Sequence, residues 1–224
     1  MHIGVDEAGR GPVMGPMVVA AVAVHDQGEL ESLGVRDSKK LTPQRREELS
    51  EIIKRRYPHS VLVVEAEEID DLRAVMTMNR LETKLFAKVI QMVMEGVEGE
   101  HELYLDAADT VEGRFGEMVV EELTKMLWRK PPLKNVVAEH GADNRYPVVS
   151  AASIIAKVER DRRIKILAEK IGDFGSGYPS DKRTIRFLKE YYEKHGVLPP
   201  GVRRTWRTIR HLIKERSQST LEGF

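Results

Sequence analysis

Short apolar runs rich in β-branched residues alternate along this chain with longer segments in which apolar residues recur every three or four positions. The first pattern is typical of buried strands and the second of amphipathic helices, so together they predict an α/β protein. We expect strands near residues 2–5, 17–24, 61–64, 103–105 and 135–138, the first two paired as a hairpin-like unit. We expect helices near residues 43–56, 79–95 and 112–128, and another that opens at 147.

Helix-capping residues mark several of the predicted boundaries. Thr42 is a predicted N-cap, and Ser180 or Asp181 caps a later helix. A last basic helix is expected to begin at 202–206. Residues 217–224 are expected to form a flexible tail.

Acidic residues follow three of the predicted strands. Asp6 and Glu7 end the first strand, Asp106 ends the fourth, and Asp143 follows the fifth. Because side chains alternate along a strand, Asp6 and Glu7 are expected on opposite faces unless the turn re-aims one of them. Like charges this close need a cation or water to compensate them, and hard divalent cations prefer such oxygen ligands. A lone Asp-Glu pair would favour a polar turn after an edge strand, but the further clusters favour a metal site.

A glycine-rich turn follows the first strand directly. Gly9 and Gly11 can adopt positive φ angles and let a ligand approach the main chain, where successive amides can hold a phosphate or a hydroxyl. Arg10 between them adds a positive charge. Further along, a turn-rich loop presents Tyr178, which either stacks on a sugar or base or fills a gap beneath its own loop.

Two single residues have weaker signals. Lys40 precedes the helix at 43–56 and is either a surface lysine or a phosphate contact. His140 is either a proton shuttle or metal ligand, or else a structural or exposed histidine, which is the commoner case.

Composition narrows the class of protein. A chain of 224 residues that is 41% hydrophobic can bury one proper core, and the absence of cysteine excludes disulfides, thiolate metal sites and cysteine nucleophiles. There is no run of about 20 apolar residues that would span a membrane. The early charges of Asp6, Glu7 and Arg10 disfavour a secretory signal, so we expect a soluble cytoplasmic protein.

Charge is distributed unevenly along the chain. Residues 178–216 contain 11 Lys/Arg and 4 Asp/Glu, a local charge of +7, whereas residues 1–177 contain 25 and 31, a local charge of −6. The C-terminal segment is therefore either a polyanion-binding surface or a charged solvated face.

The ordered set of motifs resembles ribonuclease HII, most closely its archaeal form, over nearly the whole chain. The segments that resemble it are 6–12, 37–41, 106–109, 142–143, 150–157 and 175–181. The resemblance implies an RNase H-like mixed sheet flanked by helices, with a C-terminal helical lobe. It implies a catalytic domain at 1–177 and a basic, substrate-binding lobe at 178–216.

The resemblance also implies roles for individual residues. Asp6, Glu7, Asp106 and Asp143 would be the catalytic ligands of two Mg²⁺ or Mn²⁺ ions about 3.5 to 4 Å apart, with Asp6 bridging them. Asp109 would lie outside this set, as a neighbour or helix cap. The residues implied to contact substrate are Gly9, Arg10, Gly11 and Tyr178, which would read the ribose beside the cut, and Lys40 and Lys157, which would contact phosphates.

The implied activity is cleavage of the RNA strand of RNA/DNA hybrids, and cleavage on the 5′ side of single ribonucleotides in duplex DNA. The products would have 5′-phosphate and 3′-OH ends, as in ribonucleotide excision and primer removal. We expect a monomer. The tail residues Gln218, Leu221 and Phe224 are similar to the motif that docks replication proteins on the sliding clamp PCNA, although the chain ends on the first aromatic residue of that motif.

Two other interpretations compete with this one. Ribonuclease HIII has an extra N-terminal substrate-binding domain, whereas Asp6 and Glu7 lie at the start of this sequence, which favours the type two enzyme. A catalytically silent hybrid-binding module or clamp adaptor would need no carboxylate clusters at three strand ends. Metal-dependent turnover separates these alternatives.

Overall fold

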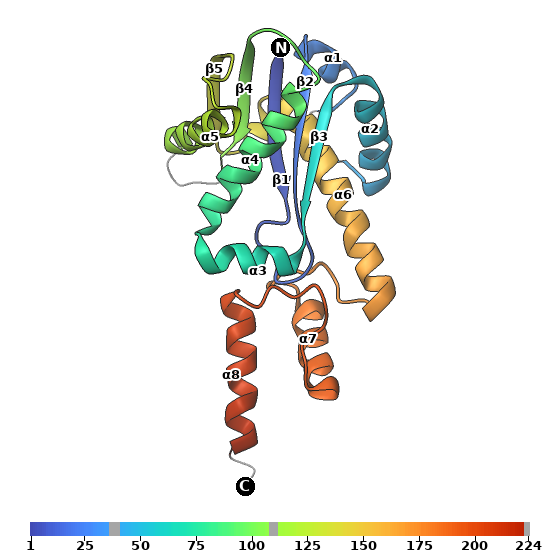
Figure 1. Cartoon of the computed structure of the whole chain (residues 1–224). Helices are drawn as coiled ribbons and strands as arrows, with labels where there is room; N and C mark the ends of the chain where they lie inside the picture. The colour runs from blue at the N-terminus through green and yellow to red at the C-terminus, as the bar shows by residue number, and fades with distance from the viewer. Residues whose placement is uncertain (36–40, 108–111, 222–224) are drawn as a thin grey trace. The chain divides into compact units, whose positions relative to one another are not determined.

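The computed structural model describes residues 1–35, 41–107 and 112–221 (Figure 1). Its five-stranded sheet has the order β3-β2-β1-β4-β5. The strands are β1 (His2–Ala8), β2 (Met17–Val24), β3 (His59–Val64), β4 (His101–Asp106) and β5 (Leu133–Glu139). The helices are α1 (Gln27–Ser32), α2 (Pro43–Arg56), α3 (Ala66–Val75), α4 (Met78–Met94), α5 (Glu112–Leu127), α6 (Pro147–Ile171), α7 (Lys182–His195) and α8 (Arg207–Leu221).

Strand pairing makes the sheet mixed, as predicted. β1 pairs antiparallel with β2, from His2 opposite Val24 to Ala8 opposite Val18, which confirms the expected hairpin-like unit. β1 pairs parallel with β4, and β4 pairs parallel with β5. The carboxyl ends of these three parallel strands therefore meet at one edge of the sheet.

Alternate residues of the strands face different helix layers. Side chains at even positions of β2 pack in an apolar cluster with residues of α1, α2 and α6. α6 begins so close to β1 that a Cβ on Gly4 would lie 2.4 Å from the carbonyl carbon of Val148, so only glycine fits there. α4 contacts α5 and β1, and Figure 1 shows it across the opposite face of the sheet.

The described chain forms two compact units. The first comprises residues 1–8, 18–63 and 76–159, and the second comprises 9–17, 64–75 and 160–224. The second unit has an apolar cluster of its own, formed by Val13, Met14, Phe174, Leu188, Val202, Ile209 and Leu212. The functional boundary predicted at residue 177 stays a prediction.

Several boundaries differ from those expected. α1 and α3 have no predicted counterpart, because each buries too few residues to give a helical pattern of apolar positions. The buried residues are Leu30 in α1, and Ala66 and Ile69 in α3. α8 begins at Arg207 rather than at 202–206, and it continues to Leu221, so the expected tail is helical to that residue. The caps at Thr42 and Asp181 are confirmed, since their side chains accept hydrogen bonds from the backbone N–H of Arg45 and Arg183.

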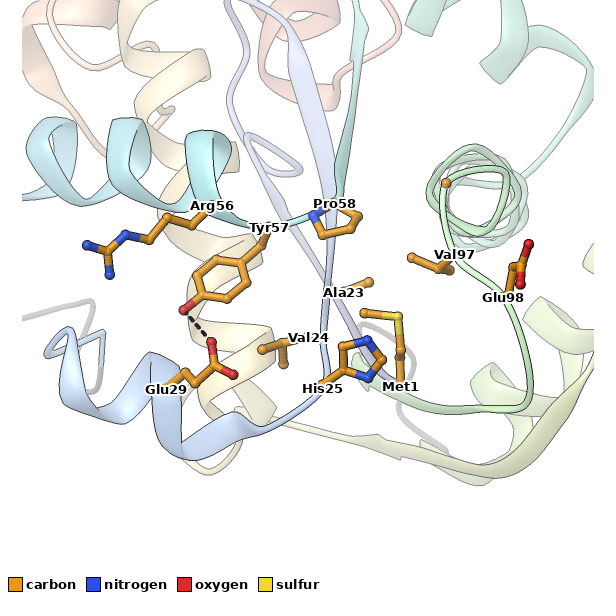
Figure 2. A pocket seen from close by; sticks show the side chains of 11 residues that line it. Met1, Ala23, Val24, His25, Glu29, Arg56, Tyr57, Pro58, Val97 and Glu98 are labelled. Atoms are coloured by element: carbon orange, nitrogen blue, oxygen red, sulfur yellow. Dashed lines mark hydrogen bonds between the residues drawn. The ribbon is translucent and has the colours of Figure 1, made fainter.

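A cavity of about 430 Å³ opens in the first unit at the end where β1 begins and β2 ends (Figure 2). Met1, Val24 and Val97 contribute apolar surface, and the Tyr57 hydroxyl donates a hydrogen bond of 3.2 Å to Glu29 at its rim. The cavity therefore lies away from the carboxyl ends of the parallel strands. Among the described helices, none combines the length and the apolar run that a bilayer crossing requires.

Candidate active site

Three acidic side chains converge at the carboxyl ends of the parallel strands in the first unit. Asp6 lies in β1, Asp106 ends β4, and Asp143 lies in a 3-10 helix (Ala142–Asn144) just after β5. One carboxylate oxygen from each residue lies within 4.8 Å of the other two. Three of the four acidic residues singled out in the sequence therefore lie together.

Hydrogen bonds from the main chain and a neighbouring side chain hold these carboxylates in place. Asp106 Oδ1 accepts from the backbone N–H of Ala142 at 3.0 Å, which ties the end of β4 to the segment after β5. Asp6 Oδ1 accepts from the N–H of Glu7 at 2.7 Å. Asp143 Oδ1 accepts from the Asn144 side chain at 2.9 Å. The three side chains are thus oriented before any ligand binds.

The cluster concentrates negative charge in a buried place. Burial raises the pKa of Asp6 to about 7, and repulsion from Asp106 and Asp143 adds to the effect. A hydrogen bond from Ser153 and the positive charge of Lys157 oppose it. Asp6 and Asp143 are each only 3% exposed, so a cation at this point would relieve a repulsion that solvent cannot screen.

The chemistry of the donors fits a hard divalent ion. All of the converging atoms are carboxylate oxygens, and Mg²⁺ and Mn²⁺ prefer such ligands to nitrogen or sulfur. The donor type and the proximity of these atoms therefore fit a divalent metal site, and Lys157 compensates only part of their charge.

Glu7 is directed differently from the other three candidates. It follows Asp6 in the same strand, so its side chain lies on the opposite face of the sheet. There it hydrogen-bonds to Glu82, a fully buried residue of α4. Burial and the repulsion from Glu82 raise the pKa of Glu7 well above its ordinary value. The described metal-competent cluster therefore contains Asp6, Asp106 and Asp143, and its relation to Glu7 stays a prediction.

The second unit brings together the residues predicted to read a ribose. Gly9 has a φ of +85°, and a Cβ on it would lie 2.6 Å from the carbonyl oxygen of Pro16, so the turn requires glycine there. A Cβ on Gly11 would lie 3.7 Å from the Tyr178 ring. Tyr178 is 37% exposed, and the guanidinium of the buried Arg160 lies 5.2 Å from its ring centroid.

The remaining predicted residues lie in other parts of the chain or outside the described residues. Lys157 lies in α6 beside the acidic cluster, and His140 is exposed after β5. Gln218 and Leu221 lie in α8. Lys40, Asp109 and Phe224 fall outside the described residues.

Neither Glu82 nor Ser153 is among the site residues predicted from the sequence, although Ser153 lies within the segment 150–157 named above. Ser153 is fully buried in α6, where it accepts a hydrogen bond from Lys157 and donates one to Asp6. A signal for Glu82 was present, because it is an acid on the apolar face of α4 between Leu81 and Leu85. A charge in such a position needs a polar partner in the core.

Comparison with known proteins agrees with the family resemblance found in the sequence. The ribonuclease HII family model matches residues 3–209. A ribonuclease HII from Thermococcus onnurineus is 47% identical, over 99% of this chain and 97% of that protein. The crystal structure of ribonuclease H2 from Pyrococcus horikoshii superposes with a TM-score of 0.85 at 42% identity, covering 96% of this chain and 97% of that one. A structure of the PCNA:RNase HII complex from Archaeoglobus fulgidus gives a TM-score of 0.81 at 45% identity, covering 95% and 96%.

Proposed function

The chain belongs to the ribonuclease HII family, and from that premise we propose that it cuts on the 5′ side of single ribonucleotides in duplex DNA and along the RNA strand of RNA/DNA hybrids. As a member of this family it is a ribonuclease H, a hydrolase that acts on phosphodiester bonds. The products would have 5′-phosphate and 3′-OH ends, as ribonucleotide excision and primer removal require. We further propose that it works as a cytoplasmic monomer.

One observation carries the catalytic proposal: the oxygens of Asp6, Asp106 and Asp143 lie within 4.8 Å of one another. These residues would hold the divalent ions, and Glu7 would complete the set. Bound Mg²⁺ or Mn²⁺ ions would supply a water of lowered pKa and charge compensation for the leaving 3′ oxygen.

The chain's own residues would prepare that chemistry in three ways. The backbone and side-chain hydrogen bonds to Asp6, Asp106 and Asp143 fix the ligand oxygens before the ions arrive. Ser153 donates to Asp6, which favours its ionised form. Lys157, with its side chain 26% exposed, would contact a phosphate of the substrate while it faces the carboxylates. Lys40 would make a second phosphate contact.

Selection of the cleavage site would depend on the Gly9–Arg10–Gly11 turn and on Tyr178. The backbone of the turn would hydrogen-bond to the 2′-OH, which is the group that separates RNA from DNA at that position. Tyr178 would lie against the sugar. The proximity of Gly11 to the Tyr178 ring supports a shared ribose subsite.

The decisive experiment uses a DNA duplex that contains one ribonucleotide, with an all-DNA duplex of the same sequence beside it. We expect metal-dependent cleavage only of the first, on the 5′ side of the ribonucleotide, and its loss in EDTA. Asp6→Asn and Asp143→Asn should reduce the rate at least 1,000-fold (about 4 kcal/mol) while the duplex still binds. Asp71→Asn, which changes an exposed aspartate of α3, is the matched control and should cut normally. A folded Asp6→Asn variant with undiminished cleavage would refute the assignment.

A second proposed function is docking on a sliding clamp. The A. fulgidus relative was solved in a complex with PCNA, and Gln218, Leu221 and Phe224 are similar to a clamp-docking motif. We expect deletion of residues 218–224 to weaken binding to PCNA at least 10-fold in calorimetry, without changing cleavage of a short duplex. Binding to PCNA that survives the deletion would end this proposal.

A further inference from the structure

Arg203 is fully buried in the second unit, and within the described part of the chain its side chain donates hydrogen bonds to three main-chain carbonyls of one turn region. Its Nε donates to the carbonyl of Gly15 at 2.9 Å, one terminal nitrogen to that of Arg10 at 3.1 Å, and the other to that of Gly9 at 2.7 Å. Burial lowers its pKa to about 9, with repulsion from Arg160 adding to the effect, so the group still carries its charge at neutral pH. An arginine fork bound to three carbonyls fixes the geometry of the chain segment that provides them.

Trp206 completes this arrangement on the next carbonyl. Its indole Nε1 donates to the carbonyl of Gly11 at 3.2 Å. Its ring lies 4.9 Å from the guanidinium of Arg203, which positions the two side chains against each other. The carbonyls of three consecutive residues, 9, 10 and 11, are therefore all held by Arg203 and Trp206.

Because the peptide bond is planar, the direction of the carbonyls in this turn also fixes the direction of its N–H groups. In a trans peptide, the carbonyl of one residue and the N–H of the next point in opposite directions. Because the carbonyls of Gly9 and Arg10 point at Arg203, the N–H groups of Arg10 and Gly11 point away from it. Residue 12 is proline and has no N–H, so the turn presents two successive amides on that side.

We propose that Arg203 and Trp206 are positioning residues for ribose selection: they hold the carbonyl side of the 9–11 turn so that its amides face the substrate 2′-OH. This inference rests on the proposed function, in which the turn reads the ribose. It assigns a specificity role to the segment that precedes α8. The preference for RNA over DNA would then depend on side chains nearly 200 positions away in the sequence, at separations of 193 to 195 residues.

Two substitutions separate positioning from general stability. Arg203→Lys keeps the charge but replaces the planar fork with a point donor, which cannot hold the carbonyls of Gly9, Arg10 and Gly15 together. Trp206→Phe keeps an aromatic ring for the guanidinium but removes the N–H that reaches Gly11, together with the five-membered ring that carries it. Trp128→Phe is the matched control, because Trp128 is 94% exposed and lies in the first unit.

The measurement is the discrimination ratio, which is the dissociation constant for the all-DNA duplex divided by that for the duplex with one ribonucleotide. Both constants are measured in an Asp6→Asn background, which prevents cleavage. The loss of one hydrogen bond should lower the ratio about 3-fold in Trp206→Phe, and the loss of the fork should lower it at least about 10-fold in Arg203→Lys. Trp128→Phe should leave the ratio unchanged. A purely structural role would lower both affinities together, in proportion to the folded fraction, and would keep the ratio constant.

The possible failures are distinguishable. If the parent protein binds both duplexes equally, the ribose-reading turn of the proposed function is wrong. If the parent discriminates and both folded variants keep its ratio, the positioning role of Arg203 and Trp206 is wrong. Circular dichroism reports whether Arg203→Lys is folded, and if it is not, Trp206→Phe alone decides between these outcomes.

Discussion

Lys157 extends from α6 so that its Nζ lies 3.8 Å from Oδ2 of Asp143. The same ammonium donates to the Oγ of Ser153, one helical turn earlier, at 2.6 Å. Ser153 in turn donates to Asp6. One face of α6 thus brings a cation and a hydroxyl to the acidic cluster. The positive charge of Lys157 compensates part of the repulsion between the carboxylates, which a metal ion would otherwise have to relieve.

We expect Lys157→Gln to destabilise the metal-free protein by about 1 kcal/mol at pH 8, because the carboxylates lose this cation. The loss should shrink in Mn²⁺, since the bound ion supplies the missing charge. Urea unfolding with EDTA or with Mn²⁺ measures both values. Lys165→Gln, which changes an exposed lysine of the same helix, should show no metal-dependent difference. An equal loss in both conditions would contradict the role of Lys157 as a partner of the cluster.

The metal-free protein should lose stability as the pH rises toward neutral. The pKa of Asp6 is about 7 in the folded chain and near its ordinary value of 3.8 in the unfolded chain. Between those values the folded state binds more protons, so the free energy of unfolding falls with rising pH, and Asp6 contributes at most about 1.4 kcal/mol per unit of pH. The raised pKa of Glu7 acts in the same direction. Urea unfolding in EDTA between pH 4 and pH 8 tests this expectation.

Asp6→Asn should make that pH profile less steep, because the amide does not titrate and the contribution of Glu7 remains. Asp71→Asn should leave the slope unchanged. In the wild type, Mn²⁺ should reverse the trend, since metal binding competes with the protons and strengthens as pH rises through about 7. A metal-free profile that rises through this range would show that Asp6 is ionised without metal.

Period-two and helical patterns were sufficient to predict most of the fold. The alternation along β1 correctly placed Asp6 and Glu7 on opposite faces, and the Thr42 cap marked the start of α2. The sequence also showed acidic residues after three strands, and the structure shows that β1, β4 and β5 are parallel, so these strand ends meet at one edge of the sheet.

The remaining features depend on contacts between distant segments, which no local pattern encodes. Arg203 resembles any residue of a basic helix start until the chain folds and closes it against Gly9 and Gly15. Glu82 meets Glu7 only because α4 packs on β1. α3 was not predicted for the same reason, because it is stabilised by a contact with a distant segment. The carboxylate of Asp70 in α3 accepts hydrogen bonds from the N–H groups of Arg204 and Thr205.

Gly9 and Gly99 form a matched pair of glycines. Their φ angles are +85° and +86°, but a Cβ at Gly9 would meet the Pro16 carbonyl at 2.6 Å, whereas Gly99 has nothing within 4 Å. Gly99→Ala should therefore cost about 1 kcal/mol, the strain of a left-handed alanine alone. Gly9→Ala should cost at least about 2 kcal/mol more, because the turn must also move.

The two glycine variants also differ in their expected effect on function. Gly9→Ala should reduce cleavage at a single ribonucleotide at least 10-fold (about 1.4 kcal/mol) among the molecules that remain folded, while Gly99→Ala should cut normally. Urea unfolding gives the stabilities, and rates corrected for the folded fraction give the activities. Equal stability losses for the two variants would show that the crowding at Gly9 relaxes without cost.

Glu82→Gln tests the buried pair of carboxyls that Glu7 and Glu82 form. The pair needs a shared proton to hydrogen-bond, and both residues repel each other once that proton is lost. Glutamine supplies an N–H donor at every pH, so the variant should stabilise the metal-free protein at pH 8 by about 1 kcal/mol. With the repulsion removed, the pKa of Glu7 should fall, and the acid limb of the cleavage rate should move to lower pH.

Glu95→Gln, which changes an exposed residue just after α4, should shift neither property. A folded Glu82→Gln variant that is less stable at pH 8 and keeps the parent pH profile would show that Glu82 stays ionised and supports the core by another interaction.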